Sequence, residues 1–380
     1  MSKKIVYLDH AAATPVDKTV LAAMEPYLIT DFYNPSAVYD SARKVRSDID
    51  RARQGVAGLI GAKSSEITFL PGGTEANNTV IKGVMDRYPG ANMLISAVEH
   101  PSVYIPAANY EHKNVPVNKT GLISVDDVFS LVDDNTALVS IIHASNEIGT
   151  IQPIADIGKR IAAVRQDRLV RGINLPLFLH TDACQSANYL DLSVSRLGVD
   201  FMTINGGKIY GPKQSGMLFH KKGTQLKPLI EGGGQEDGWR SGTENVAATI
   251  GLYESFKITR EKAKAEAERL EKLRDYLIEG ILSINSRSIL SGHPKKRLAN
   301  NVHFSFPGLD NEELLIKLDA RGIMAAAGSA CSASSREPSS VLKAIGMSTE
   351  LARSSIRVTL GRSTTKEDLD YCLMVLKELI

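Results

Sequence analysis

Short apolar runs that alternate with helix-like segments are the feature that most constrains the fold. Candidate strands lie at 67–70, 93–96, 138–143, 177–182, 201–204 and 216–219. Between them, apolar residues recur at spacings of three and four over 41–60, 75–88 and 154–164, which is typical of amphipathic helices. This alternation predicts an α/β fold with a mainly parallel sheet flanked by helices, whose ligands gather at the carboxyl ends of the strands.

The pattern changes after residue 254. Residues 257–279 indicate a long charged helix with a leucine-rich seam. Residues 301–306 and 355–360 alternate like half-buried antiparallel strands. We therefore expect a second, smaller α+β domain that runs to the C-terminus.

Composition excludes several classes of protein. A chain of 380 residues that is 43% hydrophobic can bury a large core, and a net charge of +2 without basic clusters gives no nucleic-acid or polybasic membrane signature. Apolar runs stay well short of the roughly 20 residues of a membrane span, and the start lacks a signal-peptide core, so we expect a cytoplasmic protein. Cys184, Cys331 and Cys372 have no metal-like spacing, which argues against a metal site and a disulfide scaffold.

Lys208 occupies a glycine-bounded turn, Asn205-Gly-Gly-Lys-Ile-Tyr-Gly-Pro212, directly after a candidate strand. Most loop lysines are solvated surface residues. Flanking glycines, however, let a ligand approach the backbone closely, as a Schiff-base lysine requires.

Asp182 ends another apolar strand, where a carboxylate either caps a helix or pairs with a buried cation. Together with Lys208, the second interpretation is favoured, because a pyridoxal phosphate ring needs a carboxylate on its nitrogen to stay protonated. Gln185 could bond the ring hydroxyl or lie exposed. His100 could stack on the ring or move protons, or it could be structural.

Two further patterns suit anionic groups. Gly72-Gly-Thr74 joins a strand to a helix and exposes backbone N–H groups at the positive end of the helix dipole, which suits a phosphate; alternatively Thr74 is only a helix cap. Arg357 lies on an otherwise apolar strand. It forms either a structural salt bridge or a bidentate site for a substrate carboxylate.

Cys331 lies within residues 325–335, a run of small residues that predicts a loop carrying a thiol. A reactive role and an inert, buried role both remain open from the residues alone. Cys184 and Cys372 are interpreted as packing residues.

These motifs occur in one order along nearly the whole chain. They are 7–15 (YLDHAAATP), 34–36 (NPS), 72–75 (GGTE), 99–101 (EHP), 145–149 (SNEIG), 180–186 (HTDACQS), 208–212 (KIYGP), 240–243 (RSGT), 328–332 (GSACS) and 355–357 (SIR). Together they resemble the cysteine desulfurases of the NifS/IscS kind, class V aminotransferase-like enzymes of fold type I. The resemblance implies a homodimer whose large cofactor domain spans 16–254 and whose small domain combines 1–15 with 255–380.

The resemblance also implies roles for individual residues. Lys208 would hold pyridoxal 5'-phosphate, Asp182 its ring nitrogen and Gln185 its ring oxygen. His100 would stack on the ring, and Asn146 would lie near ring and substrate. The residues implied at the phosphate are Gly73, Thr74, Asn205 and, from the other subunit, Thr243.

The implied reaction removes sulfur from L-cysteine. Asn34, Asn146 and Arg357 would bind the substrate, and Cys331 would attack its sulfur, leaving alanine and a Cys331 persulfide, with His100 as the candidate proton acceptor. The persulfide would pass to a sulfur-acceptor protein, either a scaffold or a thiolation enzyme. Iron–sulfur cluster assembly and the thiolation of tRNA, cofactors or DNA would all use this chemistry, and no direct nucleic-acid or membrane binding is expected.

One motif departs from the family pattern. Family members usually have Ser-Gly-His-Lys where this chain has Asn205-Gly-Gly-Lys208, so the histidine beside the lysine is absent. An asparagine amide can still donate to a phosphate. The alternatives are therefore a related class V enzyme (a selenocysteine lyase, a sulfinate lyase or an aminotransferase) and a weakly active paralogue that serves as a binding platform.

Overall fold

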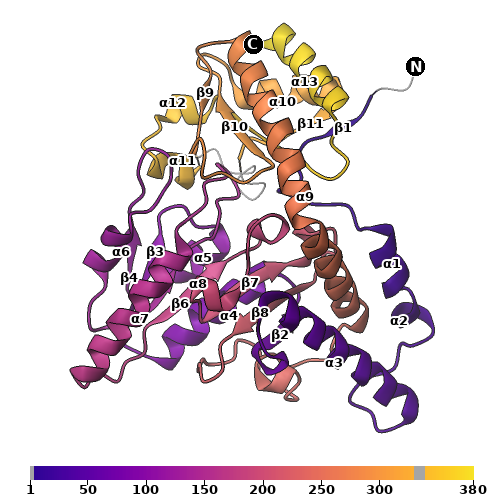
Figure 1. Ribbon diagram of the computed structural model, residues 1–380, viewed down its shortest axis with the longest axis vertical. Coiled ribbons are helices and arrows are strands. Elements are labelled where there is room, and N and C mark those ends of the chain that lie inside the picture. Colours follow the sequence, from indigo (N-terminus) through magenta and orange to yellow (C-terminus); the bar gives the residue numbers. More distant parts are fainter. Residues whose placement is uncertain (1–3, 329–338) are drawn as a thin grey trace.

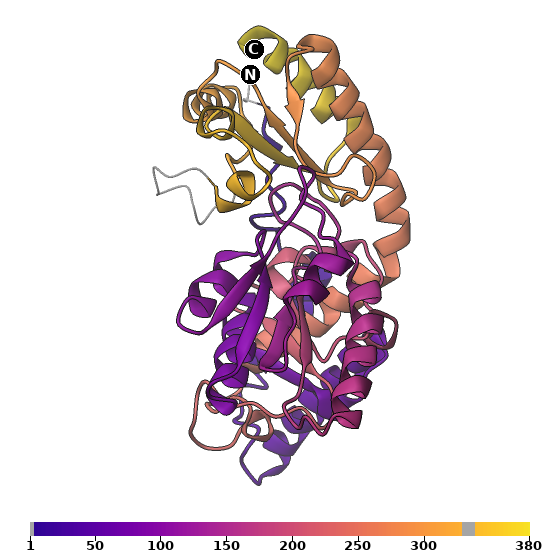
Figure 2. The same cartoon turned by 90° about the vertical axis from the view of Figure 1, so that its left-hand side faces the viewer.

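The computed structural model describes residues 4–328 and 339–380, so Cys331 lies outside the described residues. Figure 1 shows a large lower lobe and a smaller upper lobe. Helix α9 (Val246–Ile284) runs from one lobe to the other, and in Figure 2 it forms the right-hand edge of the upper lobe. Both β1 (Val6–Tyr7) and the C-terminal helix α13 (Lys366–Leu379) belong to the upper lobe.

A seven-stranded sheet forms the centre of the large lobe, in the order β2-β8-β7-β6-β5-β3-β4. Strands β4, β3, β5, β6 and β7 are parallel, and β8 is antiparallel to both of its neighbours. The predicted α/β fold with a mainly parallel sheet is therefore confirmed. The strands are β2 (Ile67–Leu70), β3 (Asn92–Ser96), β4 (His112–Val115), β5 (Thr136–Ser140), β6 (Phe178–Asp182), β7 (Phe201–Asn205) and β8 (Gly216–His220).

Helices cover both faces of this sheet. Side chains alternate between the two faces along each strand, so both faces carry apolar side chains that must be buried. Leu94 of β3 packs in the cluster that includes α3 (Asp40–Ile60) and α7 (Ile154–Val170). Its neighbours Met93 and Ile95 pack with α4 (Gly73–Arg87) and α5 (Pro101–Ala107) on the opposite face. The remaining helices are α1 (Lys18–Met24), α2 (Pro26–Ile29), α6 (Val125–Leu131), α8 (Val194–Leu197), α10 (Asn311–Ala320), α11 (Ser340–Ala344) and α12 (Thr349–Ala352).

The upper lobe is built on a small antiparallel sheet, as predicted, but all residues of the two strands expected to be half-buried, β10 and β12, are buried. Strand β10 (Asn301–Ser305) lies between β12 (Ser355–Thr359) and β9 (Ile289–Leu290). The N-terminal β1 joins this lobe by pairing in parallel with β11 (Ile323–Met324).

The N-terminal segment packs in the upper lobe. Val6 and Leu8 share one apolar cluster with side chains of α9, β10, β12 and α13, so the N-terminal segment packs with the C-terminal elements. The proposed boundary at residue 254 falls inside α9, which makes the connection a continuous helix rather than a flexible linker.

Within the described chain, we find no helix that combines the length and apolar character needed to cross a membrane.

The buried His180 generates a prediction for acid stability. Its ring nitrogens lie 2.8 Å from Ser140 Oγ and 3.1 Å from Thr203 Oγ1, and burial lowers its pKa from 6.5 to about 4. Below pH 6.5 His180 is therefore protonated in the unfolded chain but stays neutral in the folded chain until the pH approaches about 4. The free energy of unfolding consequently falls as the pH falls. His180 alone should lower the free energy of unfolding by about 2 kcal/mol when the pH falls from about 7.5 to about 5.

We expect His180→Gln, which keeps polar atoms in place but cannot titrate, to remove that increment. Urea unfolding of both proteins at the two pH values measures it, and the other histidines cancel in the comparison. An identical loss of unfolding free energy in both proteins would contradict the prediction.

Candidate active site

Polar side chains converge on one cavity at the carboxyl edge of the large sheet. Strands β5, β6 and β7 end here, and α4 and α5 begin here, so turns that are far apart in sequence meet. Arg357 reaches the cavity from β12 of the upper lobe. The predicted residues that line the cavity are Gly73, Thr74, His100, Asn146, Asp182, Gln185, Asn205, Lys208 and Arg357.

Asp182 is the buried anion of this cavity, with only 5% of its surface exposed. Its Oδ1 accepts a hydrogen bond from the Cys184 backbone N–H at 2.9 Å, and its Oδ2 accepts one from Asn77 Nδ2 at 2.7 Å. A buried carboxylate held in this way attracts a cation or a protonated ring nitrogen, since these two hydrogen bonds come from neutral donors.

Lys208 follows β7 in a short 3-10 turn, Gly206–Lys208. The turn is stabilised by Asn205, whose Oδ1 accepts a hydrogen bond from the Gly207 N–H at 3.0 Å. Lys208 Nζ donates to the carbonyl oxygens of Ala11 at 2.9 Å and Ala12 at 2.5 Å. The N-terminal segment therefore holds this amine at the cavity wall.

His100 lies at the N-terminus of α5. Its Nδ1 accepts a hydrogen bond from the Ser102 N–H at 3.1 Å and lies 2.8 Å from Ser102 Oγ, which fixes the ring. Burial lowers the pKa of His100, Asp182 raises it, and Lys208 lowers it further. The net shift is downward, which favours a neutral imidazole at neutral pH, the form that accepts protons.

The start of α4 provides donors for an anion. Gly72 precedes the helix, and among the described residues no side chain caps its first N–H groups. The amide Nδ2 of Asn205 lies 3.6 Å from the position that a Cβ on Gly73 would take. A second hollow adjoins the first here, sharing Gly73, Thr74, Asn205 and Lys208 with it and adding Lys213. Uncapped N–H groups, an amide and lysines suit a phosphate.

Arg357 is the largest fully buried side chain among the described residues, and Asp9 and Asn146 hold it. Its Nη2 donates to Asp9 Oδ1 at 2.7 Å and its Nη1 to the Asn146 carbonyl at 3.0 Å. Its Nε has no hydrogen-bond partner among the described residues. The guanidinium thus combines the structural salt bridge considered from sequence with a donor left for a further anion.

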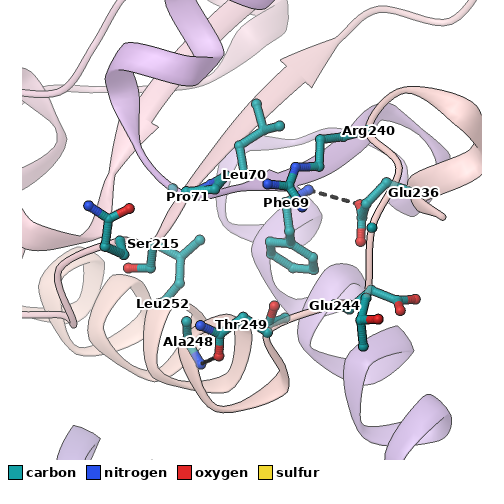
Figure 3. Close-up of a pocket in the computed structure, with 15 residues that line it drawn as sticks. Phe69, Leu70, Pro71, Ser215, Glu236, Arg240, Glu244, Ala248, Thr249 and Leu252 are labelled. Carbon is teal, nitrogen blue, oxygen red and sulfur yellow. Dashed lines mark hydrogen bonds between the residues drawn. The ribbon is translucent and has the colours of Figure 1, made fainter. Parts of the chain in front are cut away.

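Three predicted site residues are not brought into this cavity. Asn34 is exposed on the loop before α3, and its Oδ1 accepts a hydrogen bond from the Ser36 N–H at 2.9 Å. Thr243 lines a separate cavity, shown in Figure 3 with Arg240 and Glu236 at its wall. Cys331 lies outside the described residues.

Asn77 and Ser102 were missed from sequence. Asn77 is fully buried and joins Asp182 to Ser102, donating to Ser102 Oγ at 2.8 Å. It stands beside Ala76 and one turn before Val80 and Ile81 on the buried face of α4. A polar residue within an apolar helical stripe is the signal that could have found it.

Cys184 and Cys372 are both buried free thiols. Cys372 packs in the core of the upper lobe, as expected. Cys184 also lines the cavity that contains Asp182 and Lys208, so it lies closer to the candidate site than its interpretation as a packing residue implied. The part of the chain that is described contains no group of three or more His, Cys, Asp or Glu side chains placed to hold a metal ion.

This set of residues fits pyridoxal phosphate chemically. An amine, a buried carboxylate and an uncapped helix N-terminus line connected hollows. They match, in that order, the carbonyl carbon, the ring nitrogen and the phosphate of the cofactor. The absence of a side chain on Gly73 leaves room at the helix start, since a Cβ there would lie 2.8 Å from Cys184 Sγ.

Comparison with known proteins identifies the family of this chain. The family model for class-V aminotransferases matches residues 6–372, so the chain belongs to the class-V aminotransferase family.

Within that family, its relatives include cysteine desulfurases. The cysteine desulfurase IscS of Dictyoglomus turgidum is 44% identical over 385 residues, covering 100% of this chain and 95% of the relative. A NifS-like protein of known structure is 30% identical with a TM-score of 0.89, over 99% of both chains. The structure of SspA in complex with cysteine is 34% identical with a TM-score of 0.79, over 93% of this chain and 98% of that one.

The close approach at Gly73 generates a prediction. We expect Gly73→Ala to lower the free energy of unfolding by about 1–3 kcal/mol, because its Cβ would meet Cys184 Sγ. Adding Cys184→Ala should restore part of this loss. Chemical denaturation of the two single variants and the double variant measures the coupling, and strictly additive effects would contradict the proposed contact.

Proposed function

We propose that this chain is a cysteine desulfurase, which removes sulfur from L-cysteine to give L-alanine and a persulfide on Cys331. The observation that carries the proposal is the meeting of Lys208, Asp182 and Arg357 in one cavity of a chain that also contains Cys331. Relatives named cysteine desulfurase at 44% and 40% identity over nearly the whole chain support it, as does the related structure with cysteine.

The proposed cofactor is pyridoxal 5'-phosphate. Lys208 would hold its carbonyl carbon, Asp182 its ring nitrogen and Gln185 its ring oxygen, while His100 would lie against the ring. The residues proposed at the phosphate are Gly73, Thr74, Asn205 and, from a partner subunit, Thr243. When bound, this cofactor supplies an electron sink for the substrate's α-carbon.

The chain's own residues bind the substrate and move its protons. Arg357 would receive the carboxylate of cysteine through the donors of its guanidinium, with Asn146 beside it and Asn34 as a further proposed contact. Lys208 Nζ is the amine that would take the α-proton of the substrate and return it. His100, whose pKa is lowered by burial, can accept the thiol proton of Cys331.

Sulfur transfer then needs no external oxidant. Cys331 Sγ attacks the sulfur of the substrate, and the S–S bond forms as the substrate's Cβ–S bond breaks. The bonding electron pair leaves with the carbon skeleton, which takes up protons and departs as alanine. Because the attacking group must be a thiolate, reaction requires a reduced Cys331, which is consistent with the proposed cytoplasmic location. The proposed recipient of the persulfide sulfur is a sulfur-acceptor protein, such as one for iron–sulfur cluster assembly.

The decisive experiment mixes the cofactor-loaded protein with cysteine and measures alanine and protein-bound persulfide. We expect both products from the wild type. Cys331→Ser should lose both by a factor of about 10³ or more, since it removes the nucleophile. Alanine formation that survives in Cys331→Ser would favour a lyase or aminotransferase instead.

We also propose that the active enzyme is a homodimer. Large apolar side chains are exposed along the N-terminal stretch of α1, α2 and the loop that follows. They are Leu21, Leu28, Ile29, Phe32, Val38 and Tyr39, with 51–83% of their surface exposed. An apolar stretch of this kind marks a protein interface. A partner would also account for Thr243, which lies outside the cavity of its own subunit.

Sedimentation should therefore detect a dimer that Ile29→Asp combined with Phe32→Asp dissociates, because two buried charges would lie at the interface. Cofactor affinity should fall with the dimer. Leu169→Asp combined with Val170→Asp is the matched control, since these side chains at the end of α7 are 71% and 80% exposed. A dimer that only the control disrupts, or a monomeric wild type, would contradict the proposal.

A further inference from the structure

Glu147 is a buried carboxyl that the proposed chemistry does not use. It follows Asn146, and only 4% of its surface is exposed. Its backbone is fixed on both sides: its N–H donates to Ser145 Oγ at 3.3 Å, and its carbonyl accepts a hydrogen bond from Asn301 Nδ2 at 2.9 Å. Asn301 begins β10 of the upper lobe. Glu147 therefore lies where the upper lobe meets the loop between β5 and α7, which carries Asn146 and is called the active-site loop below.

Two chain segments converge on the carboxyl group of Glu147. Ser339 Oγ donates a hydrogen bond to its Oε2 at 2.6 Å. Gly328 lies against the same oxygen, since a Cβ on Gly328 would be 3.3 Å from Oε2. Gly328 also has φ +149°, a conformation that a side chain would strain. These two residues directly flank residues 329–338, the segment whose sequence contains Cys331.

Ser339 transmits this contact to a helix. Its Oγ also accepts hydrogen bonds from the backbone N–H groups of Val341 at 3.1 Å and Leu342 at 3.4 Å, so the same hydroxyl caps α11. Val341 and Leu342 pack with Ile142 and Ile148 of the active-site loop. Helix α11, which follows residues 329–338, is thus held against the active-site loop by the hydrogen bond between Ser339 and Glu147 and by this apolar cluster.

The electrostatic environment shows why this carboxyl is costly to keep. Burial raises the pKa of Glu147, while the Ser339 hydrogen bond and the charge of Arg357 lower it. A buried carboxyl contributes little net stability for its desolvation. Its contacts with both flanks of one segment therefore point to a task beyond packing.

We propose that Glu147 is a positioning residue for sulfur transfer. Its carboxyl holds Ser339 through a hydrogen bond and lies near Gly328. In this way it sets where the segment between these two residues starts and ends relative to the bound substrate. The inference rests on the proposed desulfurase function. Cys331 is three residues beyond Gly328 in the sequence. A small shift of the anchor would therefore change the approach of the thiol.

The test separates cysteine binding from sulfur transfer in single turnovers of the cofactor-loaded dimer. Cysteine binding is followed by the change in cofactor absorbance, and transfer by persulfide on Cys331. Glu147→Ala and Ser339→Ala should slow persulfide formation about 10- to 100-fold, because misplacement by an ångström has effects of this size. Cysteine affinity should stay within about twofold of wild type.

Three further variants test the hydrogen bond between Glu147 and Ser339 and control for the loss of a helix cap. Glu147→Gln keeps an oxygen that can accept from Ser339 and should retain most of the transfer rate. Ser348→Ala is the matched control, because Ser348 caps the neighbouring helix α12 through the Leu351 N–H and should leave transfer unchanged. The double variant of Glu147 and Ser339 should be no slower than Glu147→Ala alone.

Wild-type transfer rates in Ser339→Ala and Glu147→Ala would overturn the inference. So would an equal loss of cysteine binding and transfer, or an equal effect of Ser348→Ala, since either would indicate a purely structural role. Because Ser339→Ala removes a single hydroxyl, it keeps the test valid if Glu147→Ala fails to fold. A wild type that binds cysteine without forming persulfide would instead refute the proposed function, and the inference would fall with it.

Discussion

The burial of the Asp182 carboxylate is the constraint on which the site depends. A charge at the end of a buried strand must be compensated, and Asn77 and the Cys184 N–H provide only neutral donors. Asn77 in turn fixes Ser102, which holds His100 at the start of α5. One buried carboxylate thereby orients two helices and the ring of a histidine, and it leaves a place for a cation in the cavity.

Residues near both ends of the chain complete the cavity that lies at the edge of the central sheet. The N-terminal segment crosses the cavity and offers the Ala11 and Ala12 carbonyls to Lys208, while Asp9 pairs with Arg357 of β12. Since that segment also pairs with β11, the cavity is closed by the same elements that form the upper lobe. Motion between the lobes would therefore act directly on the side of the cavity where Arg357 lies.

Much of this was predictable from local patterns. The strands from β2 to β8 with strong apolar runs were found, since buried parallel strands have a clear signal. The polar β4, His112–Val115, was missed because it has no apolar run, and α5 was missed because Pro101 and Pro106 interrupt its helical pattern. Asp182, Lys208 and Arg357 were recognised by type, but the link through Asn77 depends on tertiary contact. The separate position of Thr243 could not be derived from local sequence patterns, because it depends on tertiary packing.

Lys208 is the residue proposed to hold the cofactor, and one measurement tests this most directly. The purified protein, loaded with pyridoxal phosphate, is reduced with borohydride and digested, and the modified peptide is identified by mass spectrometry. We predict the reduced cofactor on Lys208 alone, because its Nζ lies in the cavity that contains Asp182. Attachment to Lys213, which lines only the adjoining hollow, or no attachment to any lysine would contradict the account.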